Sequence, residues 1–202
     1  MRFKAIVFDM GGVILSLDRD LCIRNFKQKA GFSDIEEYLD IYHQKGFISD
    51  FEEGILDEEG FYAESLKHCP PGAKAEDIRS SFCSLLKCAD PDVLAQIRAL
   101  SAAGYDIYVL SNNNPICTRR FKEILLEADS LQYFKDMFFS FEWKLLKPGL
   151  AIYQKLARTI GCLPEEILFL DDAVSNVEGA KAAGINAVLF TPGTDILKLV
   201  ND

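Results

Sequence analysis

The chain has 202 residues, of which 49% are hydrophobic, and a formal net charge of −9. These values fit one globular core of ordinary size with room for an insertion. The acidic balance makes nucleic acid and anionic membrane surfaces poor partners, and no apolar run approaches the roughly 20 residues that a membrane-spanning helix needs.

The first predicted element is a strand over residues 5–9 that ends on an acid. Four apolar residues run directly into Asp9, and two glycines, Gly11 and Gly12, follow at once. A short continuous apolar run is typical of a strand that is buried on both faces. Such a strand would hold the carboxylate of Asp9 rigidly, and the glycines would let the main chain approach a phosphate or a metal ion without a Cβ in the way.

The distance from Asp9 to the next predicted strand is unusually long. Nearly a hundred residues separate the two, far more than one crossover helix needs. The last part of this stretch, residues 90–104, has Asp90 as a good N-cap and Pro91 in the first turn, so it is the crossover helix. The remainder, residues 17–89, must be an insertion.

The inserted segment is predicted to be helical throughout. Ser33 and Glu36 form a capping box at the start of a helix over residues 33–44, and apolar residues at helical spacing predict another helix over residues 76–87. The expected domains are a core of residues 1–16 and 90–202 and an all-helical cap of residues 17–89.

Beyond the crossover helix, strands and helices alternate to the end of the chain. Runs of β-forming residues predict the strands, and apolar residues at helical spacing, stopped by Gly161 and Gly184, predict the helices. The strands are expected over 105–111, 137–140, 166–172 and 186–190, and the helices over 114–128, 151–161 and 176–184. With the first strand they make a five-stranded parallel sheet covered on both faces, which is the Rossmann-like, doubly wound α/β class.

Polar residues follow the carboxyl ends of these strands. In open parallel sheets, ligands bind beyond that edge, at the point where the strand order reverses. The residues expected there are Asp9, Ser111, Asn112, Asp171 and Asp172, with Lys147 from the loop after the 137–140 strand. Crowded acids repel one another and need a cation, and oxygen ligands without histidine or cysteine suit Mg²⁺.

This set of residues fits phosphoryl transfer. Mg²⁺, the Lys147 ammonium, the Ser111 hydroxyl and main-chain N–H groups could together hold a phosphoryl group. Asp9 would then be free to attack phosphorus and form an aspartyl-phosphate, which water would hydrolyse. The expected partner is a small phosphorylated metabolite, whose charge a divalent cation would offset.

Four short motifs give the sequence a resemblance to a known family. In chain order they are "FDMGGVI", "VLSNNN", the "KP" at residues 147–148 and "FLDDAVSNVEGAKAAG", and each lies at a predicted strand end or in the loop after one. Together they resemble the motifs of the haloacid dehalogenase-like hydrolases, in the phosphatase-like branch that has a helical cap inserted after the first strand. The resemblance covers nearly the whole chain.

The resemblance implies a role for each motif residue. Asp9 would be the catalytic nucleophile, and Lys147 would neutralise both the nucleophile and the phosphate. The phosphate-binding residues would be Ser111, Asn112, Lys147 and Gly12. The Mg²⁺ ligands would be Asp9, the main-chain carbonyl of Gly11, Asp172 and Asp171, the last bound to the metal or to its water shell, with Asn176 in support.

The sequence departs from the family pattern in two places. Phosphatases of the family usually carry a second Asp two residues after the nucleophile, where this chain has Gly11, so the proton for the leaving group must come from elsewhere. An easy leaving group, water, a cap residue or slow turnover would each accommodate the loss. Asp18 and Asp20 could supply a proton, although acids at a helix start are the commoner interpretation. Around the "KP", Lys144 and Gly149 replace a frequent Gly and a frequent acid.

Three other activities stay open. A dehalogenase would also lack the second Asp, but it would not need the acids Asp171 and Asp172 for a metal. A phosphomutase needs a general acid–base within reach, which Gly11 does not provide. A weakly active or non-catalytic regulatory protein that keeps the phosphate and metal site ranks second after the phosphatase.

The remaining distinctive residues are interpreted structurally. His43, His68 and Trp143 are expected at the surface or in packing, and the acidic stretch "DFEEG" (50–54) is expected to be a solvated face. The six cysteines form no C-x-x-C pair, and Asp9 interrupts the first apolar run too early for a signal peptide, which indicates a cytoplasmic protein with reduced thiols. The choice between monomer and homodimer is left open.

Overall fold

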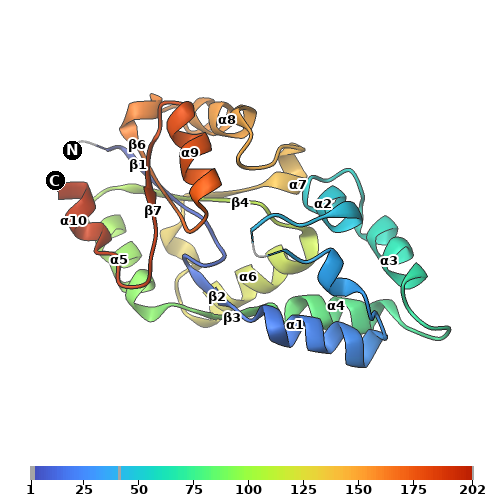
Figure 1. Cartoon of the computed structure of the whole chain (residues 1–202). Helices are drawn as coiled ribbons and strands as arrows, with labels where there is room; N and C mark the ends of the chain where they lie inside the picture. The colour runs from blue at the N-terminus through green and yellow to red at the C-terminus, as the bar shows by residue number, and fades with distance from the viewer. Residues whose placement is uncertain (1–2, 41, 202) are drawn as a thin grey trace.

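A parallel sheet of five strands forms the centre of the computed structural model, which describes residues 3–40 and 42–201. The strand order is β5-β4-β1-β6-β7, so the order reverses beside the first strand (Figure 1). The strands are β1 (Ala5–Phe8), β4 (Asp106–Ser111), β5 (Asp136–Phe139), β6 (Ile167–Asp171) and β7 (Asn186–Leu189). The predicted doubly wound parallel sheet is confirmed.

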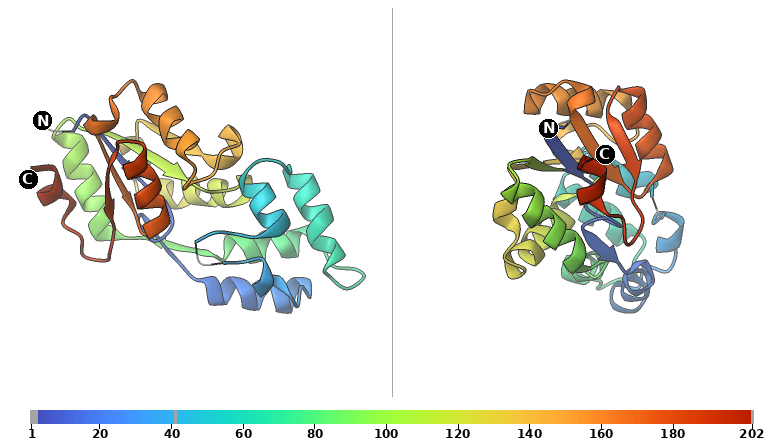
Figure 2. Two further views of the ribbon diagram at one scale, coloured as in Figure 1. Left: turned by 45° about the horizontal axis from the view of Figure 1, so that its top comes forward. Right: turned by 90° about the vertical axis from the view of Figure 1, so that its left-hand side faces the viewer.

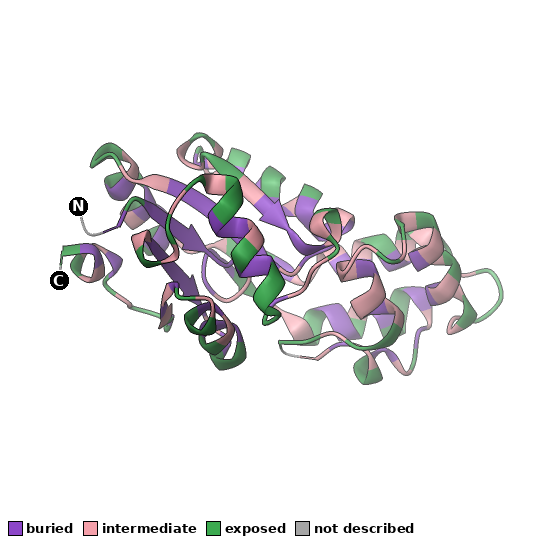
Figure 3. Ribbon diagram, turned by 90° about the horizontal axis from the view of Figure 1, so that it is seen from above, coloured by how far each residue is buried: buried purple, intermediate pink, exposed green. Residues whose placement is uncertain are grey.

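Both faces of the sheet are buried. Ile6 and Phe8 of β1 belong to one apolar cluster and Ala5 and Val7 to a second, because successive side chains of a strand point to opposite faces. The sheet accordingly lies buried between layers of helices whose outer faces are exposed (Figure 3). The helices on the first face are α5 (Pro91–Ala102), α6 (Pro115–Glu127) and α10 (Ile196–Asn201), and those on the second are α8 (Leu150–Ile160) and α9 (Val174–Ala182).

Local capping residues set the ends of the core helices. The Asp90 side chain accepts hydrogen bonds from the first turn of α5, and Asn114 caps α6 ahead of Pro115. Gly161 ends α8 in the left-handed conformation, with φ 70°. Because these signals are local, α5, α6, α8 and α9 begin and end within two residues of their predicted bounds.

The segment between β1 and α5 lies beyond the carboxyl edge of the sheet, away from both termini (Figures 1 and 2). Its core is aromatic: the ring of Phe82 lies 5.9 Å from Phe26 and 5.6 Å from Phe61, and all three are buried. The helical elements are α1 (Arg19–Asn25), a π-helical turn (Phe26–Ala30), a 3-10 turn (Ile35–Glu37), α2 (Gly46–Glu52), α3 (Glu58–Lys67) and α4 (Ala75–Cys83).

The expectation of helix throughout this segment needs a correction at its two ends. They pair as an antiparallel ladder of β2 (Leu15–Leu17) and β3 (Leu86–Ala89), with Leu17 opposite Leu86. The helix predicted over residues 76–87 therefore ends at Cys83. A pairing between segments so far apart in sequence overrides the local helical periodicity.

The helix predicted over residues 33–44 is wrong. Only the single 3-10 turn at Ile35–Glu37 forms, and residue 41 of the predicted span lies outside the described residues. The Asp40 side chain instead accepts hydrogen bonds from the main-chain N–H groups two and three residues later. Such side-chain turns compete with helix formation, so Asp40 prevents the helix that the apolar spacing predicts.

His68 and Trp143 take the packing roles expected of them. All six cysteines are free thiols. His68 stacks on Phe32 at 4.9 Å between ring centroids, and Trp143 stacks on Phe138 at 4.8 Å. Within residues 3–40 and 42–201, no helix combines the length and the hydrophobicity that crossing a membrane requires.

Candidate active site

The carboxyl ends of two neighbouring strands, β1 and β6, bring three acids together. Asp9 follows β1 directly, Asp171 is the last residue of β6, and Asp172 comes next. One carboxylate oxygen from each of these residues lies within 4.8 Å of the other two. The sequence predicted this meeting, and the parallel order of β1 and β6 produces it.

A buried lysine neutralises part of this charge. The Lys147 ammonium lies 2.9 Å from Oδ1 of Asp9 and 2.6 Å from Oδ2 of Asp171. Asn112 holds the main chain of Lys147 in place: its side-chain amide donates to the Lys147 carbonyl at 2.9 Å, and its side-chain oxygen accepts from the Lys147 N–H at 2.8 Å. The side chain of Asn112 is thus committed to the lysine loop, and a phosphate contact would fall to its main chain.

The loop after β4 adds a hydroxyl to the site. Ser111, the last residue of β4, is buried, and its hydroxyl donates to the carbonyl of Asn112 over a long 3.3 Å. This weak bond leaves the hydroxyl able to turn toward a ligand in the pocket that Ser111 lines with Asp9 and Lys147.

Asp171 is fully buried and saturated with hydrogen bonds. Its Oδ1 accepts from the Ala173 N–H at 2.9 Å and from the Asn176 amide at 3.0 Å, and its Oδ2 also accepts from Asn176 at 3.1 Å beside the Lys147 contact. Asp171 therefore positions Lys147 and Asn176. Asp9 and Asp172 are the more accessible carboxylates of the group.

Gly12 has a steric role in the site. Its φ is +72°, and a Cβ built on it would lie 2.0 Å from Oδ2 of Asp172. Its N–H donates to the Leu15 carbonyl at 2.8 Å, so the phosphate contact predicted for Gly12 does not fit this structure. Gly12 instead makes room for Asp172. Gly11, the predicted carbonyl ligand, lines the same pocket.

Burial and mutual repulsion shift the pKa values of these groups. Burial raises the pKa of Asp9 to about 7, helped by the charges of Asp171 and Asp172 and opposed by the Lys147 ammonium. Burial and the charge of Asp171 also raise the pKa of Asp172. The pKa of Lys147 is raised although burial acts to lower it, because Asp171 and Asp9 hold its proton. Ionising both Asp9 and Asp172 is thus costly without a further cation.

The residues present fit a bound Mg²⁺ ion. Three carboxylates face one ammonium, an excess of two negative charges that a divalent cation would balance. The donor atoms are all oxygens, which a hard ion such as Mg²⁺ prefers. Among the described residues, the buried Oδ1 of Asn176 has no hydrogen-bond partner, and Asn176 lines the same pocket. An unsatisfied oxygen there suits a metal ion with its water shell.

Replacing Gly12 with alanine is expected to abolish Mg²⁺ binding. The new Cβ would push away the Asp172 carboxylate, and the left-handed backbone would cost about 1–2 kcal/mol of stability. In thermal unfolding, the rise in midpoint that Mg²⁺ gives the wild-type protein should disappear. Gly193→Ala is the matched control, since Gly193 has φ +87° with nothing within 4 Å of a built Cβ. A Gly12→Ala protein that still responds to Mg²⁺ like this control would contradict the steric role.

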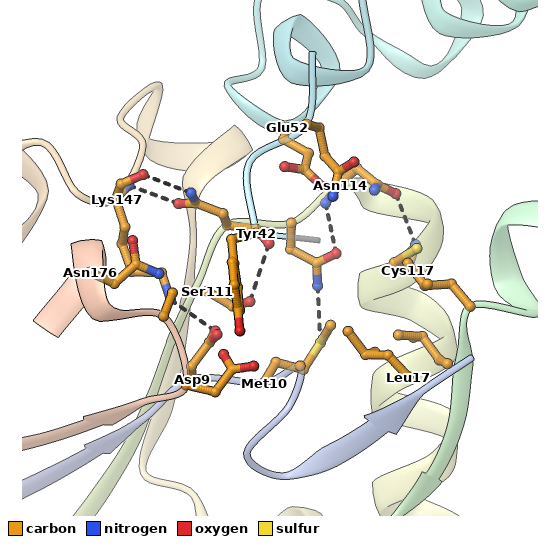
Figure 4. A pocket seen from close by; sticks show the side chains of 18 residues that line it. Asp9, Met10, Leu17, Tyr42, Glu52, Ser111, Asn114, Cys117, Lys147 and Asn176 are labelled. Atoms are coloured by element: carbon orange, nitrogen blue, oxygen red, sulfur yellow. Dashed lines mark hydrogen bonds and ion pairs between the residues drawn. The ribbon is translucent and has the colours of Figure 1, made fainter. Parts of the chain in front are cut away.

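The inserted segment contributes pocket residues that sequence reasoning missed. Tyr42, Gln44 and Glu52 line the pocket together with Asp9 and Lys147 (Figure 4). The stretch containing Glu52 was expected to be a solvated face, because nothing in its sequence separates a pocket acid from a surface acid. Asp18, by contrast, is the N-cap of α1, and its Oδ1 accepts a hydrogen bond from the Leu21 N–H at 2.9 Å. This agrees with the interpretation of Asp18 as a helix-start acid.

Glu52 is the most perturbed acid of the inserted segment. Burial raises the pKa of its carboxyl to about 8, the negative charge of Asp9 adds to the rise, and the Lys147 ammonium opposes it. A carboxyl group with such a pKa keeps its proton at neutral pH.

Polar contacts tie the inserted segment to the core around the pocket. Arg119 of α6 donates to both carboxylate oxygens of Glu58 at 2.8 and 2.9 Å, and His43 Nε2 lies 2.9 Å from the Ser175 hydroxyl of α9. His43 therefore lies at the surface as expected, and it also connects the inserted segment to the core. These bonds hold the segment over the strand ends.

Comparisons with known proteins agree with this geometry. Residues 3–184 match the family model of the haloacid dehalogenase-like hydrolases. The chain is 31% identical over 198 residues to a D-ribitol-5-phosphate phosphatase of Bacteroides thetaiotaomicron, covering 95% of this chain and 94% of that protein. It is 28% identical to a phosphorylated carbohydrates phosphatase of Thermotoga maritima, covering 92% of this chain and 83% of that protein.

Solved structures show the same fold. An alanine variant of a haloacid dehalogenase family enzyme from Bacteroides thetaiotaomicron, in complex with magnesium and inorganic phosphate, superposes with a TM-score of 0.90 at 27% identity. The match covers 99% of this chain and all of that one.

Proposed function

The chain belongs to the haloacid dehalogenase-like hydrolases, and on that premise we propose that it is a Mg²⁺-dependent phosphatase of small phosphorylated metabolites that works through a phosphoryl group carried on Asp9. The observation that carries the proposal is the contact of the Asp9 carboxylate with the Lys147 ammonium at 2.9 Å, beside Asp172 in the pocket that all three residues line. A nucleophile, a fixed cation and room for a divalent metal are the parts that phosphoryl transfer needs.

The side chains divide the reaction between them. A carboxylate oxygen of Asp9 attacks phosphorus, the bond from phosphorus to the leaving oxygen breaks, and water then hydrolyses the aspartyl-phosphate. Lys147 orients Asp9 and neutralises charge on the phosphoryl oxygens, and the Ser111 hydroxyl donates a hydrogen bond to one of them. Asp9, Asp172 and the Gly11 carbonyl would hold Mg²⁺, which when bound supplies further charge neutralisation.

Residues 17–89 act in this proposal as a cap over a core of residues 1–16 and 90–202. The Glu58–Arg119 and His43–Ser175 contacts support a closed position, in which water is excluded during the transfer. Tyr42, Gln44 and Glu52 then form the upper wall of the pocket.

The substrate class we propose is a polyol or sugar phosphate. The relatives reported above act, by name, on ribitol phosphate and on phosphorylated carbohydrates. A second cavity of about 440 Å³ adjoins the pocket and shares Gln44 and Asp172 with it. Arg19, Asp20 and Asp40 also line it, and these donors and acceptors suit a chain of hydroxyl groups.

A substrate panel tests the function. Wild-type protein should release inorganic phosphate from ribitol 5-phosphate and aldose phosphates in Mg²⁺, and excess EDTA should lower the rate by roughly a hundredfold or more. Nucleoside monophosphates should be poorer substrates, because the adjoining cavity offers polar groups and few aromatic faces for a base. Phosphate release is measured by a colorimetric assay, and readdition of Mg²⁺ after EDTA is the control.

Two results would contradict the proposal. Chelator-insensitive release of halide from 2-haloacids would indicate a dehalogenase. Tight binding of beryllium fluoride without hydrolysis of any phosphate ester would indicate the regulatory protein. For location we propose the cytoplasm, because six free thiols suit a reducing compartment.

A further inference from the structure

The chain lacks the acid that usually stands two residues after the nucleophile and protonates the leaving group. Gly11 stands two residues after Asp9 and offers no side chain. A polyol or sugar leaves phosphorus as an alkoxide, which is a strong base, and general acid catalysis of such a departure is typically worth about a hundred- to ten-thousandfold. An efficient enzyme therefore needs a proton donor from another part of the chain.

Glu52 is the acid that lies in the required direction. An in-line displacement puts the leaving oxygen on the side of phosphorus away from Asp9. Glu52, the last residue of α2, enters the pocket from the inserted segment, across from Asp9 (Figure 4). Among residues 3–40 and 42–201 its carboxyl group makes no ion pair or hydrogen bond, and a half-buried acid without a partner is unusual.

The main chain fixes the position of Glu52 against the core. Ser140, the buried first residue of α7 (Ser140–Trp143), donates its hydroxyl hydrogen to the Glu52 carbonyl. The same hydroxyl oxygen accepts the N–H of Asn113 at 2.9 Å, so one serine joins Glu52 to the loop that follows Ser111. Gly54 lets the segment after α2 approach the main chain of α7 this closely, because its φ is +73° and a Cβ on it would lie 2.1 Å from the Phe141 carbonyl oxygen.

We propose that Glu52 is the general acid and base of this site, an inference that rests on the proposed phosphatase function. In the first step, Asp9 bonds to phosphorus, the bond to the leaving oxygen breaks, and that oxygen takes the proton of Glu52. In the second step, a water molecule in the vacated position bonds to phosphorus, its proton passes to Glu52, and the bond from phosphorus to Asp9 breaks. Both steps balance, and Glu52 ends protonated as it began.

The charge around Glu52 supports this cycle. The titratable groups that line the pocket with it are Asp9, Asp172, Tyr42, Cys117 and Lys147. Burial first, and then the charge of Asp9, raise the pKa of Glu52 to about 8, while Lys147 alone opposes the rise. At neutral pH the group therefore begins as the proton donor that the first step needs.

Comparing two leaving groups tests the proposal with Glu52→Gln. With ribitol 5-phosphate, kcat/KM should fall by roughly a hundred- to ten-thousandfold, because the alkoxide needs the proton. With p-nitrophenyl phosphate, whose leaving group departs without one, the variant should give a rapid burst of about one nitrophenolate per active site and then slow turnover, because water lacks its base. Glu53→Gln, the neighbouring acid outside the pocket, should match wild type on both substrates.

The outcomes separate this proposal from the function on which it rests. A wild-type protein that needs Asp9 and Mg²⁺ for turnover supports the phosphatase function by itself. If the wild-type protein behaves in this way, two results would overturn only the role of Glu52. One is a Glu52→Gln variant with unchanged activity, and the other is a variant whose activity falls equally with both substrates and shows no burst. Glu52→Asp guards against misfolding: it keeps a carboxyl group and should recover part of the ribitol 5-phosphate turnover, and its failure to exceed Glu52→Gln would also overturn the role.

Discussion

Replacing Asp9 with asparagine is expected to abolish phosphate release, by roughly ten-thousandfold or more in kcat. The amide oxygen of asparagine cannot form the acyl phosphate, although its side chain has nearly the same shape. Ser111 and Lys147 would still bind phosphate and Asp172 would still hold Mg²⁺, so the effect should fall on kcat and leave KM within about tenfold. The measurement is phosphate release in Mg²⁺, together with a trapping experiment in which acid-quenched wild-type protein carries labelled phosphate and the variant carries none.

The fold of the Asp9→Asn variant should remain intact. Burial raises the pKa of Asp9, so the ionised carboxylate is unfavourable in the folded metal-free protein, and its removal should not lower the unfolding midpoint. Asp106→Asn is the matched control, because Asp106 begins β4 at the opposite edge of the sheet and pairs with Lys135 near the surface. Appreciable turnover by Asp9→Asn would end the proposal of a phosphoryl group on Asp9.

Replacing Lys147 with methionine is expected to cost about 3–5 kcal/mol of unfolding free energy near neutral pH in EDTA, because it leaves two buried carboxylates without their cation. Methionine is of similar length, so the loss reports charge and not a cavity. Phosphate release should also fall by roughly a hundred- to a thousandfold, since a fixed positive charge beside the phosphoryl group is lost. Urea unfolding and steady-state kinetics measure the two effects.

The stability loss of Lys147→Met should depend on pH in a stated direction. Lys147 lowers the pKa of Asp9, so in the variant the folded-state pKa of Asp9 should lie still further above its unfolded value. An acid with a raised folded-state pKa destabilises the fold increasingly as pH rises from the unfolded value through the folded one. The difference from wild type should thus be small at about pH 5 and large at about pH 8. Lys181→Met, which removes only a surface ion pair with Glu178 at 3.0 Å, should change stability little at either pH.

The core of this protein could be predicted because its signals are local. The run at Ala5–Phe8 is apolar on both faces, Asp90 and Pro91 begin one helix, and Gly161 ends another. Parallel order then follows from the alternation of strands and helices, and it brings Asp9 and Asp171 to one edge of the sheet.

The inserted segment was harder to predict because its structure depends on distant contacts. Leu17 and Leu86 become strand residues only by pairing with each other, and the Asp40 turn replaces a helix that the apolar spacing favoured. Neither effect is visible within a window of neighbouring residues.

The sequence by itself determined the parallel sheet and the acids and serine at its edge, because each depends on strand periodicity or on a residue at or directly after a strand end, and the "KP" motif pointed to Lys147 in a later loop. Only the tertiary structure decided three further points. The Asn112 side chain holds the main chain of Lys147, the missing Cβ of Gly12 leaves room for the Asp172 carboxylate, and Glu52 enters the pocket across from Asp9. Those roles arise from the approach of segments that lie far apart in the chain, and local sequence does not encode such an approach.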